Sequence, residues 1–297
     1  MARREALMFY LLISPWLVGF VLLVAGPVIA SLVLSFTQWD LANPPTWVGP
    51  GNYITLFTSD RLFFASLRVT GNWVLIGVPL RLVVSLIVAL LLNQQIRAMG
   101  FFRTVYYLPS VVSGVAVALL WVWVLQPQYG LLNELLRMLG LPTPSWLGSE
   151  EWALPAFIMM SLWGTGATMV IFLAGLQGIP LELYEAADID GAGLWRKFTN
   201  VTMPLITPVL LFNLITGIIA SFQVFAQAFI MTNGGPNNAT LFYVLYLYRV
   251  AFQYSQMGYA SAMAWILFII VLACTLAVFR WSQSWVHYEG DVRGRAK

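Results

Sequence analysis

The sequence predicts an all-α, polytopic membrane protein, and three observations support this fold class. Of the 297 residues, 60% are hydrophobic and only 9% are charged, whereas soluble domains carry roughly 25% charged residues. The mean hydropathy is +0.80. The apolar residues form runs long enough to cross the roughly 30 Å hydrocarbon core of a bilayer as helices of about 20 residues. Most of the chain therefore has lipid as its solvent.

Six such runs predict six transmembrane helices. The spans are expected at about 8–36, 67–92, 104–125, 152–175, 205–231 and 257–280. The first run follows a short charged start, but it is too long for the roughly 7–15-residue core of a signal peptide. The sequence contains no internal repeat or low-complexity tract. Residues 1–297 are therefore expected to form a single transmembrane domain.

Shorter segments join the spans. Residues 37–65 are rich in turn-forming sequence and are expected to be a loop. Residues 126–151 are expected to be a loop with a short helix at Leu131–Leu139. The segment 232–256 contains the apolar stretch Leu241–Phe252, which is too short to cross the membrane alone. We expect this stretch to form an interfacial helix outside the membrane.

The basic residues orient the spans. With the N-terminus in the cytoplasm and the spans alternating, ten basic residues fall in cytoplasmic segments, namely Arg3, Arg4, Arg97, Arg103, Arg196, Lys197, Arg280, Arg293, Arg295 and Lys297. Three fall outside, namely Arg61, Arg137 and Arg249. The positive-inside rule then places both termini and the segment 180–204 in the cytoplasm. The net charge of +3 follows from this topology and does not indicate nucleic-acid binding.

The segment Leu181–Pro208 is a polar island in this apolar chain. It holds six charged residues, namely Glu182, Glu185, Asp188, Asp190, Arg196 and Lys197. Residues 152–181 and 198–248 on either side contain no Asp, Glu, Lys or Arg. The island must therefore lie in water or against another protein. Its sequence predicts a helix that begins at Pro180, a turn at Gly191 and Gly193, and a second short helix over Leu194–Asn200.

The sequence lacks the motifs of catalytic, nucleotide and metal sites. Neither GxxxxGK[ST] nor HExxH occurs, and the single Cys274 forms no intrachain disulfide. The lone His287 fits a membrane interface. All twelve acidic residues lie outside the apolar spans, which argues against an autonomous proton-coupled transporter but leaves a sodium-coupled one open.

Arg81 is the only basic residue in the middle of a predicted span. A charge at this depth is expected to face the protein interior or a water-filled cavity. Two interpretations stay open at this point. Arg81 is either a residue of a transport pathway or a structural residue, paired with a neighbouring subunit or snorkelling at the helix kink expected at Pro79.

The polar island resembles the EAA loop of importer permeases of the ATP-binding-cassette (ABC) class. The family pattern is EAA, three residues, Gly, nine residues, Ile, any residue and Leu-Pro. Glu185-Ala186-Ala187, Gly191 and Pro204 keep this spacing, while Val201 and Met203 are conservative departures. Further likenesses to carbohydrate-importer permeases are Leu176-Gln177-Gly178-Ile179-Pro180, Thr232-Asn233-Gly234-Gly235-Pro236, Tyr106 with Leu108-Pro109, and Gly51-Asn52-Tyr53. The likeness extends over about residues 8–285.

This resemblance implies a type I ABC-importer permease (MetI-like) fold in the plasma membrane, the inner membrane of a bacterium. The chain is similar to the shorter, six-span member of the permease pair in sugar and glycerol-phosphate importers. The implied partners are a second homologous permease, two ATPase subunits and an extracytoplasmic solute-binding protein that delivers the cargo. ATP and magnesium would be bound by the ATPase subunits, so this chain is expected to be a transport subunit without catalytic residues, cofactor or metal.

The resemblance also implies roles for particular residues. The residues expected to couple the chain to the ATPase lie in the cytoplasmic loop 180–204 and are Glu185, Ala186, Ala187, Asp188, Gly191 and Leu194. In the family, substrate contacts come from the later spans. The polar and aromatic candidates for the substrate path here are Ser161, Trp163, Thr168, Ser221, Gln223 and Gln227. Aromatic faces, amides and hydroxyls suit the CH faces and hydroxyls of a sugar.

Three interpretations of the cargo and mechanism follow. The first is import of a sugar. The second is the same machine importing glycerol-3-phosphate or a polyol, and the third is a different class, a stand-alone secondary transporter or a membrane enzyme that lacks an ATPase. A phosphorylated cargo would favour basic residues in the path, and only Arg81 is available in this chain. The sequence therefore favours a neutral sugar.

Overall fold

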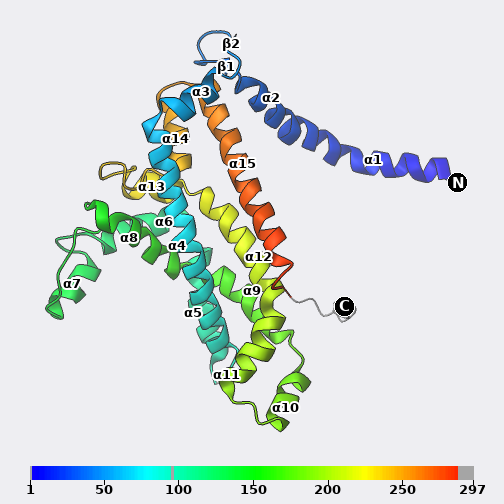
Figure 1. The fold of residues 1–297 in the computed structure, drawn as a ribbon, viewed down its shortest axis with the longest axis vertical. Coiled ribbons are helices and arrows are strands. Elements are labelled where there is room, and N and C mark those ends of the chain that lie inside the picture. The colour runs from blue at the N-terminus through cyan, green and yellow to red at the C-terminus, as the bar shows by residue number, and fades with distance from the viewer. Residues whose placement is uncertain (1, 95–96, 287–297) are drawn as a thin grey trace. The chain divides into compact units, whose positions relative to one another are not determined.

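The structure, a computed structural model, describes residues 2–94 and 97–286, apart from the side chains of residues 2, 3, 6 and 7. These ranges are almost entirely helical (Figure 1), as predicted. The predictions for His287 and for the basic tail lie outside the described residues. The chain divides into two compact units, Met1–Phe63 with Tyr246–Ile270, and Phe64–Leu245 with Val271–Lys297. Each unit is described separately.

The first unit contains the N-terminal helices, a small two-stranded hairpin and a short helix. Its complete elements are α1 (Ala2–Phe20), the π-helical turn η1 (Val21–Ala25), α2 (Gly26–Leu34), β1 (Thr37–Gln38), β2 (Thr46–Trp47), α3 (Gly51–Thr58) and the π-helical turn η3 (Arg249–Gln253). The two strands pair antiparallel, with Thr37 opposite Trp47. The expected loop at 37–65 therefore contains a two-stranded hairpin and a helix.

The hairpin is fixed to the start of helix α15 (Met257–Ser282) by backbone contacts. The backbone N–H of Met257 donates to the carbonyl of Trp39 over 2.9 Å. A Cβ placed on Gly258 would lie 1.9 Å from the Thr37 carbonyl oxygen. Only glycine permits this approach, so the first turn of α15 and the strand lie closer together than any side chain would allow.

The second unit contains the remaining helices. They are α4 (Arg61–Leu92, from residue 64), α5 (Met99–Val111), α6 (Gly114–Val124), α7 (Leu131–Met138), α8 (Glu150–Trp163), α9 (Gly166–Gln177), α10 (Leu181–Ile189), α11 (Leu194–Lys197), the π-helical turn η2 (Phe198–Thr202), α12 (Met203–Phe222) and α13 (Ala226–Met231). Helix α7 is the short helix predicted at Leu131–Leu139. Helix α14 (Tyr243–Tyr248) and α15 contribute residues to both units.

Among the described residues, four uninterrupted helical segments are long and apolar enough to cross a membrane. They are Met8–Leu34, Arg61–Leu92, Leu194–Phe222 and Met257–Ser282. Two bent pairs raise the number to six when each pair counts as one span. These are α5 with α6, bent by 98°, and α8 with α9, bent by 47°. The predicted count of six agrees with this upper number.

Three predicted spans are not continuous helices. The spans expected at 104–125, 152–175 and 205–231 break between α5 and α6, between α8 and α9, and between α12 and α13. Residues at the breaks explain why. Ser113 caps the start of α6, where its hydroxyl accepts a hydrogen bond from the N–H of Ala116 over 3.4 Å. Gly164 follows the last residue of α8. Apolar composition predicts membrane depth, but it does not reveal such breaks.

The beginning of the fifth span also differs from the prediction. The separate short helix expected over Leu194–Asn200 is instead continuous with α12, since Leu194–Phe222 forms one helical segment through η2. Pro208 lies inside α12 and cannot donate to the carbonyl of Pro204. The hydroxyl of Thr207 donates to that carbonyl over 2.6 Å. This hydrogen bond replaces the one that Pro208 cannot make, and the helix continues past Pro208.

The segment Leu241–Phe252, expected to be an interfacial helix, is buried at its start, while Phe252 at its end is 63% exposed. The segment is helical, as α14 and η3. However, Leu241, Phe242, Tyr243 and Leu245 are at most 1% exposed. These residues are packed inside the protein, because their apolar side chains find partners in the fold.

A cluster of buried apolar residues joins the helices α4, α9 and α12 of the second unit. Leu86, Ala89 and Leu92 of α4 pack with Met169, Phe172, Leu173 and Leu176 of α9 and Ile206 of α12. Gly175 permits this packing, since a Cβ there would lie 2.7 Å from a Val209 methyl carbon. Close-packed cores transmit displacement instead of absorbing it. The cluster is therefore a rigid link between α9 and α12.

Candidate functional site

The three helix breaks of the second unit meet at one cavity of about 410 Å³. Residues from the breaks line it, namely Pro109, Ser110 and Gly114 of the first, Gly164 and Ala167 of the second, and Gln223, Val224 and Gln227 of the third. Non-helical backbone at membrane depth is tolerated where it is buried in protein or lines a water-filled cavity. The breaks therefore indicate a site, because elsewhere in the bilayer they would leave backbone groups unpaired.

Aromatic side chains form part of the wall of this cavity. Trp163 is 41% exposed and makes an edge-to-face contact with Trp121, with ring centroids 6.2 Å apart. Trp73 and Phe157 also line the cavity, and both contact the buried ring of Phe242. These contacts hold the rings in fixed orientations. A fixed, partly exposed indole offers a flat apolar face on which a ring-shaped ligand can stack.

Polar side chains lie between the aromatic ones. The hydroxyl of Ser161 donates to the Ile158 carbonyl over 2.7 Å, which leaves its oxygen lone pairs to accept a hydrogen bond. Gln223 lies in the link between α12 and α13, and Gln227 lies in the first turn of α13. Among the described residues, neither glutamine amide has a hydrogen-bond partner. The cavity thus presents neutral donors and acceptors.

Four of the six residues predicted for a substrate path lie at this cavity. They are Ser161, Trp163, Gln223 and Gln227. Thr168 lines a small adjoining recess together with Asn213 and Gly217. Ser221 lines neither space and is 2% exposed, with no hydrogen-bond partner for its hydroxyl among the described residues. The structure brings four candidates together and places two outside the cavity.

Arg81 lines both the cavity and the adjoining recess. Its Nε atom is buried without a hydrogen-bond partner among the described residues. The sequence signal was present, since Arg81 is the one basic residue in the middle of an apolar span. Pro79 lies two residues earlier inside α4 and cannot donate to the carbonyl of Leu75. The structure thus favours the interpretation of Arg81 as a residue that faces a cavity.

The loop 180–204 also belongs to the second unit. It contains the helices α10 and α11, which lie at one end of that unit (Figure 1). Helix α10 ends in a Schellman motif, in which the N–H of Ala192 donates to Ala187 over 2.9 Å and that of Gly191 donates to Asp188 over 3.0 Å. Gly191 has a φ of +71°. This left-handed conformation favours glycine, so the predicted turn at Gly191 has a defined backbone cause.

Side-chain contacts join the two helices of this loop. The ammonium of Lys197 in α11 forms an ion pair with the carboxylate of Asp188 in α10. The hydroxyls of Tyr184 and Thr202 lie 2.9 Å apart and share a hydrogen bond. These contacts connect α10 to η2, which continues into α12. A force applied to α10 would therefore reach a helix that ends at the cavity.

The outer surface of the loop combines acidic and apolar residues. Glu185, Ala186, Asp188, Gly191 and Leu194 are exposed and Ala187 is half-buried. Large apolar side chains are also exposed, namely Leu181, Ile189, Leu194 and Trp195, each at 69% or more. Exposed apolar patches rimmed by polar residues mark interaction sites. The surface therefore suits contact with another protein.

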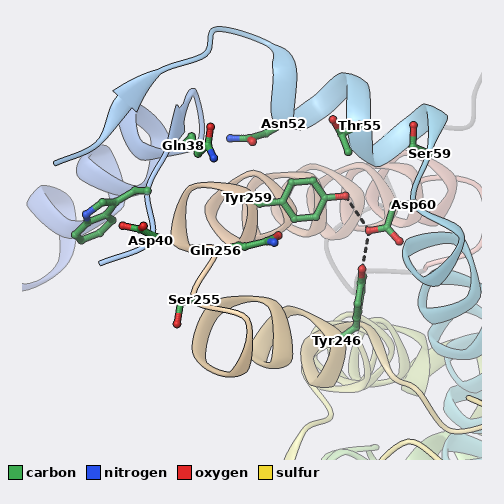
Figure 2. A pocket seen from close by; sticks show the side chains of 11 residues that line it. Gln38, Asp40, Asn52, Thr55, Ser59, Asp60, Tyr246, Ser255, Gln256 and Tyr259 are labelled. Atoms are coloured by element: carbon green, nitrogen blue, oxygen red, sulfur yellow. Dashed lines mark hydrogen bonds between the residues drawn. The ribbon is translucent and has the colours of Figure 1, made fainter. Parts of the chain in front are cut away.

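The first unit contains its own polar cavity, of about 500 Å³ (Figure 2). The hydroxyls of Tyr246 and Tyr259 both donate to Oδ2 of Asp60, over 2.7 Å and 2.8 Å. The other carboxylate oxygen accepts the N–H of Phe63 over 2.9 Å and so caps α4. No group of three or more His, Cys, Asp or Glu among the described residues could hold a metal ion.

Comparison with known proteins identifies the class. Residues 81–287 match the family model described as "Binding-protein-dependent transport system inner membrane component". The chain is 43% identical over 291 residues to the "Probable ABC transporter permease protein YesP" of Bacillus subtilis (strain 168), covering 97% of this chain and 94% of that protein. It is 34% identical over 283 residues to the "Trehalose/maltose transport system permease protein MalF" of Thermococcus litoralis, covering 93% of this chain and 94% of that protein.

A solved structure supports the same conclusion. The chain matches the bacterial alginate ABC transporter, crystallised in complex with an alginate pentasaccharide-bound periplasmic protein, with a TM-score of 0.80. The identity is 25%, and 95% of this chain and 96% of that chain are covered.

The broken helices, the cavity and the fold define an ABC-importer permease, a multi-pass membrane protein. The chain belongs to the family of inner membrane components of binding-protein-dependent transport systems. The family resemblance inferred from the loop 180–204 is thereby confirmed.

Proposed function

We propose that this permease translocates a sugar through the cavity of its second unit. The observation that carries the proposal is the meeting of three helix breaks at one cavity, where Trp163 lies with Ser161, Gln223 and Gln227. The fixed indole suits the CH face of a sugar ring, and the amides suit its hydroxyls. The relatives named for trehalose/maltose and alginate transport support a saccharide as the cargo.

The energy for transport comes from separate subunits in this proposal. The chain is a transport subunit that binds no cofactor, and ATP with magnesium is bound and hydrolysed by two ATPase subunits. A second homologous permease completes the path, and an extracytoplasmic binding protein delivers the cargo. The complex of the alginate transporter with its periplasmic protein supports the last of these partners.

The loop 180–204 is proposed as the contact with the ATPase. Exposed Glu185 meets a basic residue there, small Ala186 and Ala187 allow close approach, and Leu194 adds apolar contact. Movement of α10 passes through the Lys197–Asp188 and Tyr184–Thr202 contacts into α12. Because α12 ends at Phe222, directly before the cavity residue Gln223, this movement changes the cavity.

The proposed orientation places both termini and the loop 180–204 in the cytoplasm. Single cysteines introduced into a Cys274→Ser background test it with a thiol reagent that does not cross membranes. Asp190→Cys should react only after the membrane is opened, and Asn237→Cys should react in intact cells. The reverse pattern would overturn the orientation.

Reconstitution separates sugar import from the alternatives. Proteoliposomes that contain both permeases, the ATPase subunits and the cognate binding protein should accumulate labelled saccharide only with ATP. The permease alone should accumulate none, whereas a secondary transporter would act alone. The same assay with labelled glycerol-3-phosphate and a polyol tests the second alternative. Uptake of these compounds in place of any saccharide would contradict the proposed cargo.

A further inference from the structure

Arg81 is the only charged residue among the described residues that line the cavity of the second unit. The other lining residues are apolar, aromatic, hydroxyl or amide side chains. The adjoining recess has the same character, because Thr168 and Asn213 are its neutral polar residues and Arg81 is again its only charge. The electrostatic character of the cavity therefore depends on this guanidinium.

Helix ends do not offset this charge. Each of the three breaks provides one helix C-terminus, which attracts cations, and one helix N-terminus, which attracts anions. The partial charges of opposite ends at a break largely cancel. Arg81 carries a full charge, because its guanidinium stays protonated in proteins. The cavity is therefore positive overall.

A guanidinium at membrane depth is costly when it has no counter-ion. Charged side chains inside membranes pair with one another, contact backbone carbonyls or mark a transport pathway. Among the described residues, Arg81 forms no ion pair, and its Nε lacks any hydrogen-bond partner. All acidic residues of the sequence lie outside the apolar spans. Nothing in the described part of this chain neutralises Arg81, so the opposite charge comes from another molecule.

We propose that Arg81 binds a carboxylate of the cargo, and that the cargo is an acidic saccharide containing a uronic acid residue. This inference rests on the proposed sugar-import function. A guanidinium matches a carboxylate through two parallel N–H···O hydrogen bonds. A carboxylate carries one negative charge and balances Arg81. A phosphate carries nearly two negative charges near neutral pH. It would therefore leave an excess negative charge in the cavity.

The remaining lining residues fit the rest of such a ligand. Trp163 offers an apolar face to the sugar ring, while Gln223 and Gln227 offer amides to its hydroxyls. Arg81 lines the recess with Thr168 and Asn213 and also lines the cavity. This arrangement revises the preference for a neutral sugar, because a basic residue that was merely available in the sequence lies at the cavity in the structure.

The first experiment identifies the class of cargo. The cognate binding protein is screened by thermal shift against matched pairs of oligosaccharides, such as digalacturonate and its carboxyl-reduced neutral counterpart. We expect stabilisation by a uronate-containing member and not by its reduced form. Stabilisation by neutral saccharides alone would overturn the inference while leaving sugar import intact. Stabilisation by no saccharide would instead contradict the proposed function.

The second experiment tests Arg81 in the complete transporter in proteoliposomes. Arg81→Gln should lower ATP-driven uptake of the uronate saccharide by about tenfold to a hundredfold, as expected for loss of hydrogen bonds to a charged group. Arg81→Lys should recover part of that loss, since it keeps the charge but loses the planar fork. Arg68→Gln removes a charge from the same helix outside the cavity and serves as the control, with unchanged uptake.

A carboxylate of the second permease subunit is the competing partner for Arg81. In that case Arg81→Gln would reduce the yield of assembled complex in the absence of cargo. It would also lower uptake of uronate and neutral saccharides alike. Either result would overturn the inference. We expect normal assembly and a loss of uptake confined to the uronate cargo.

Discussion

Tyr246 donates a hydrogen bond of 2.7 Å to Oδ2 of Asp60, although 186 positions separate the two residues in the chain. Tyr259 donates to the same oxygen over 2.8 Å (Figure 2). Asp60 thereby connects the start of α4 to α14 and α15 within the first unit. This carboxylate accepts hydrogen bonds from the hydroxyls of Tyr246 and Tyr259 and from the N–H of Phe63.

Replacing Asp60 should therefore destabilise the protein. Asp60→Ala removes the cap of α4 and both tyrosine hydrogen bonds, and we expect a loss of about 3 kcal/mol. Asp60→Asn keeps an acceptor and should lose less. Thermal unfolding of the purified protein in detergent measures both. Asp40→Ala, which alters an exposed carboxylate bonded to Asn43, is the control and should shift the melting temperature less than either variant. An unchanged melting temperature for Asp60→Ala would contradict the prediction.

Stability should fall at alkaline pH through Tyr246. Burial, together with the hydrogen bond to Asp60 and its negative charge, raises the pKa of the Tyr246 phenol above its ordinary value. The folded state thus favours the protonated phenol. This contribution is complete below the unfolded pKa of about 10 and is lost as the pH rises above it. The melting temperature should drop above about pH 10, and Tyr246→Phe should show a shallower drop from a lower starting value. Parallel pH profiles would refute this role.

Glu185 should be required for coupling but not for folding. Its side chain is exposed on α10, so Glu185→Lys should insert normally into the membrane. We expect ATP-driven uptake in proteoliposomes to fall by at least about tenfold, because a repulsive pair replaces an attractive one at the ATPase contact. Glu182→Lys makes the same charge change on the same helix outside the matched motif and should retain most uptake. Normal transport by Glu185→Lys would rule out the proposed contact.

Gly191 and Gly193 form a matched pair for testing the backbone of the loop. Gly191 has a φ of +71°, so Gly191→Ala should cost about 1–2 kcal/mol locally through its left-handed conformation. Gly193 has a φ of −67°, which alanine adopts without strain. No heavy atom within 4 Å would obstruct a Cβ at either position. Faster hydrogen exchange of α10, with reduced uptake, is expected only for Gly191→Ala. Equal behaviour of the two variants would show that the turn does not require glycine.

The sequence predicts several elements closely, and the reasons are local. The helix α7 and the turn at Gly191 follow from short-range signals, and the C-terminal end of α4 and the N-terminal end of α15 follow from hydropathy. The loop 180–204 is recognisable because its charges interrupt two long uncharged stretches. The continuous helix that joins this loop to α12 cannot be recognised from the sequence, because prolines normally end helices. Continuity there depends on η2 and on the Thr207 hydroxyl.

Some residues of the cavity can likewise be recognised from the sequence, and others cannot be told apart from buried residues. Trp163, Gln223 and Gln227 stand out as polar or aromatic residues in apolar spans, and a polar residue there signals packing or function. Ser221 carries the same signal but is buried away from the cavity. The position of a residue along its helix does not show whether it lines the cavity or is buried elsewhere. The reason is that neighbouring residues at a helix break face different surroundings.

The sequence by itself determined the membrane class, the number of apolar spans and the segment expected to meet an ATPase. Composition and spacing suffice for these, since lipid forces apolar runs into helices and leaves charge clusters outside. Only the tertiary structure decided that three of the six apolar runs break, that the breaks meet, and that Arg81 lies where they meet. The physical reason is that a break at membrane depth is stable only when residues distant in the sequence surround it.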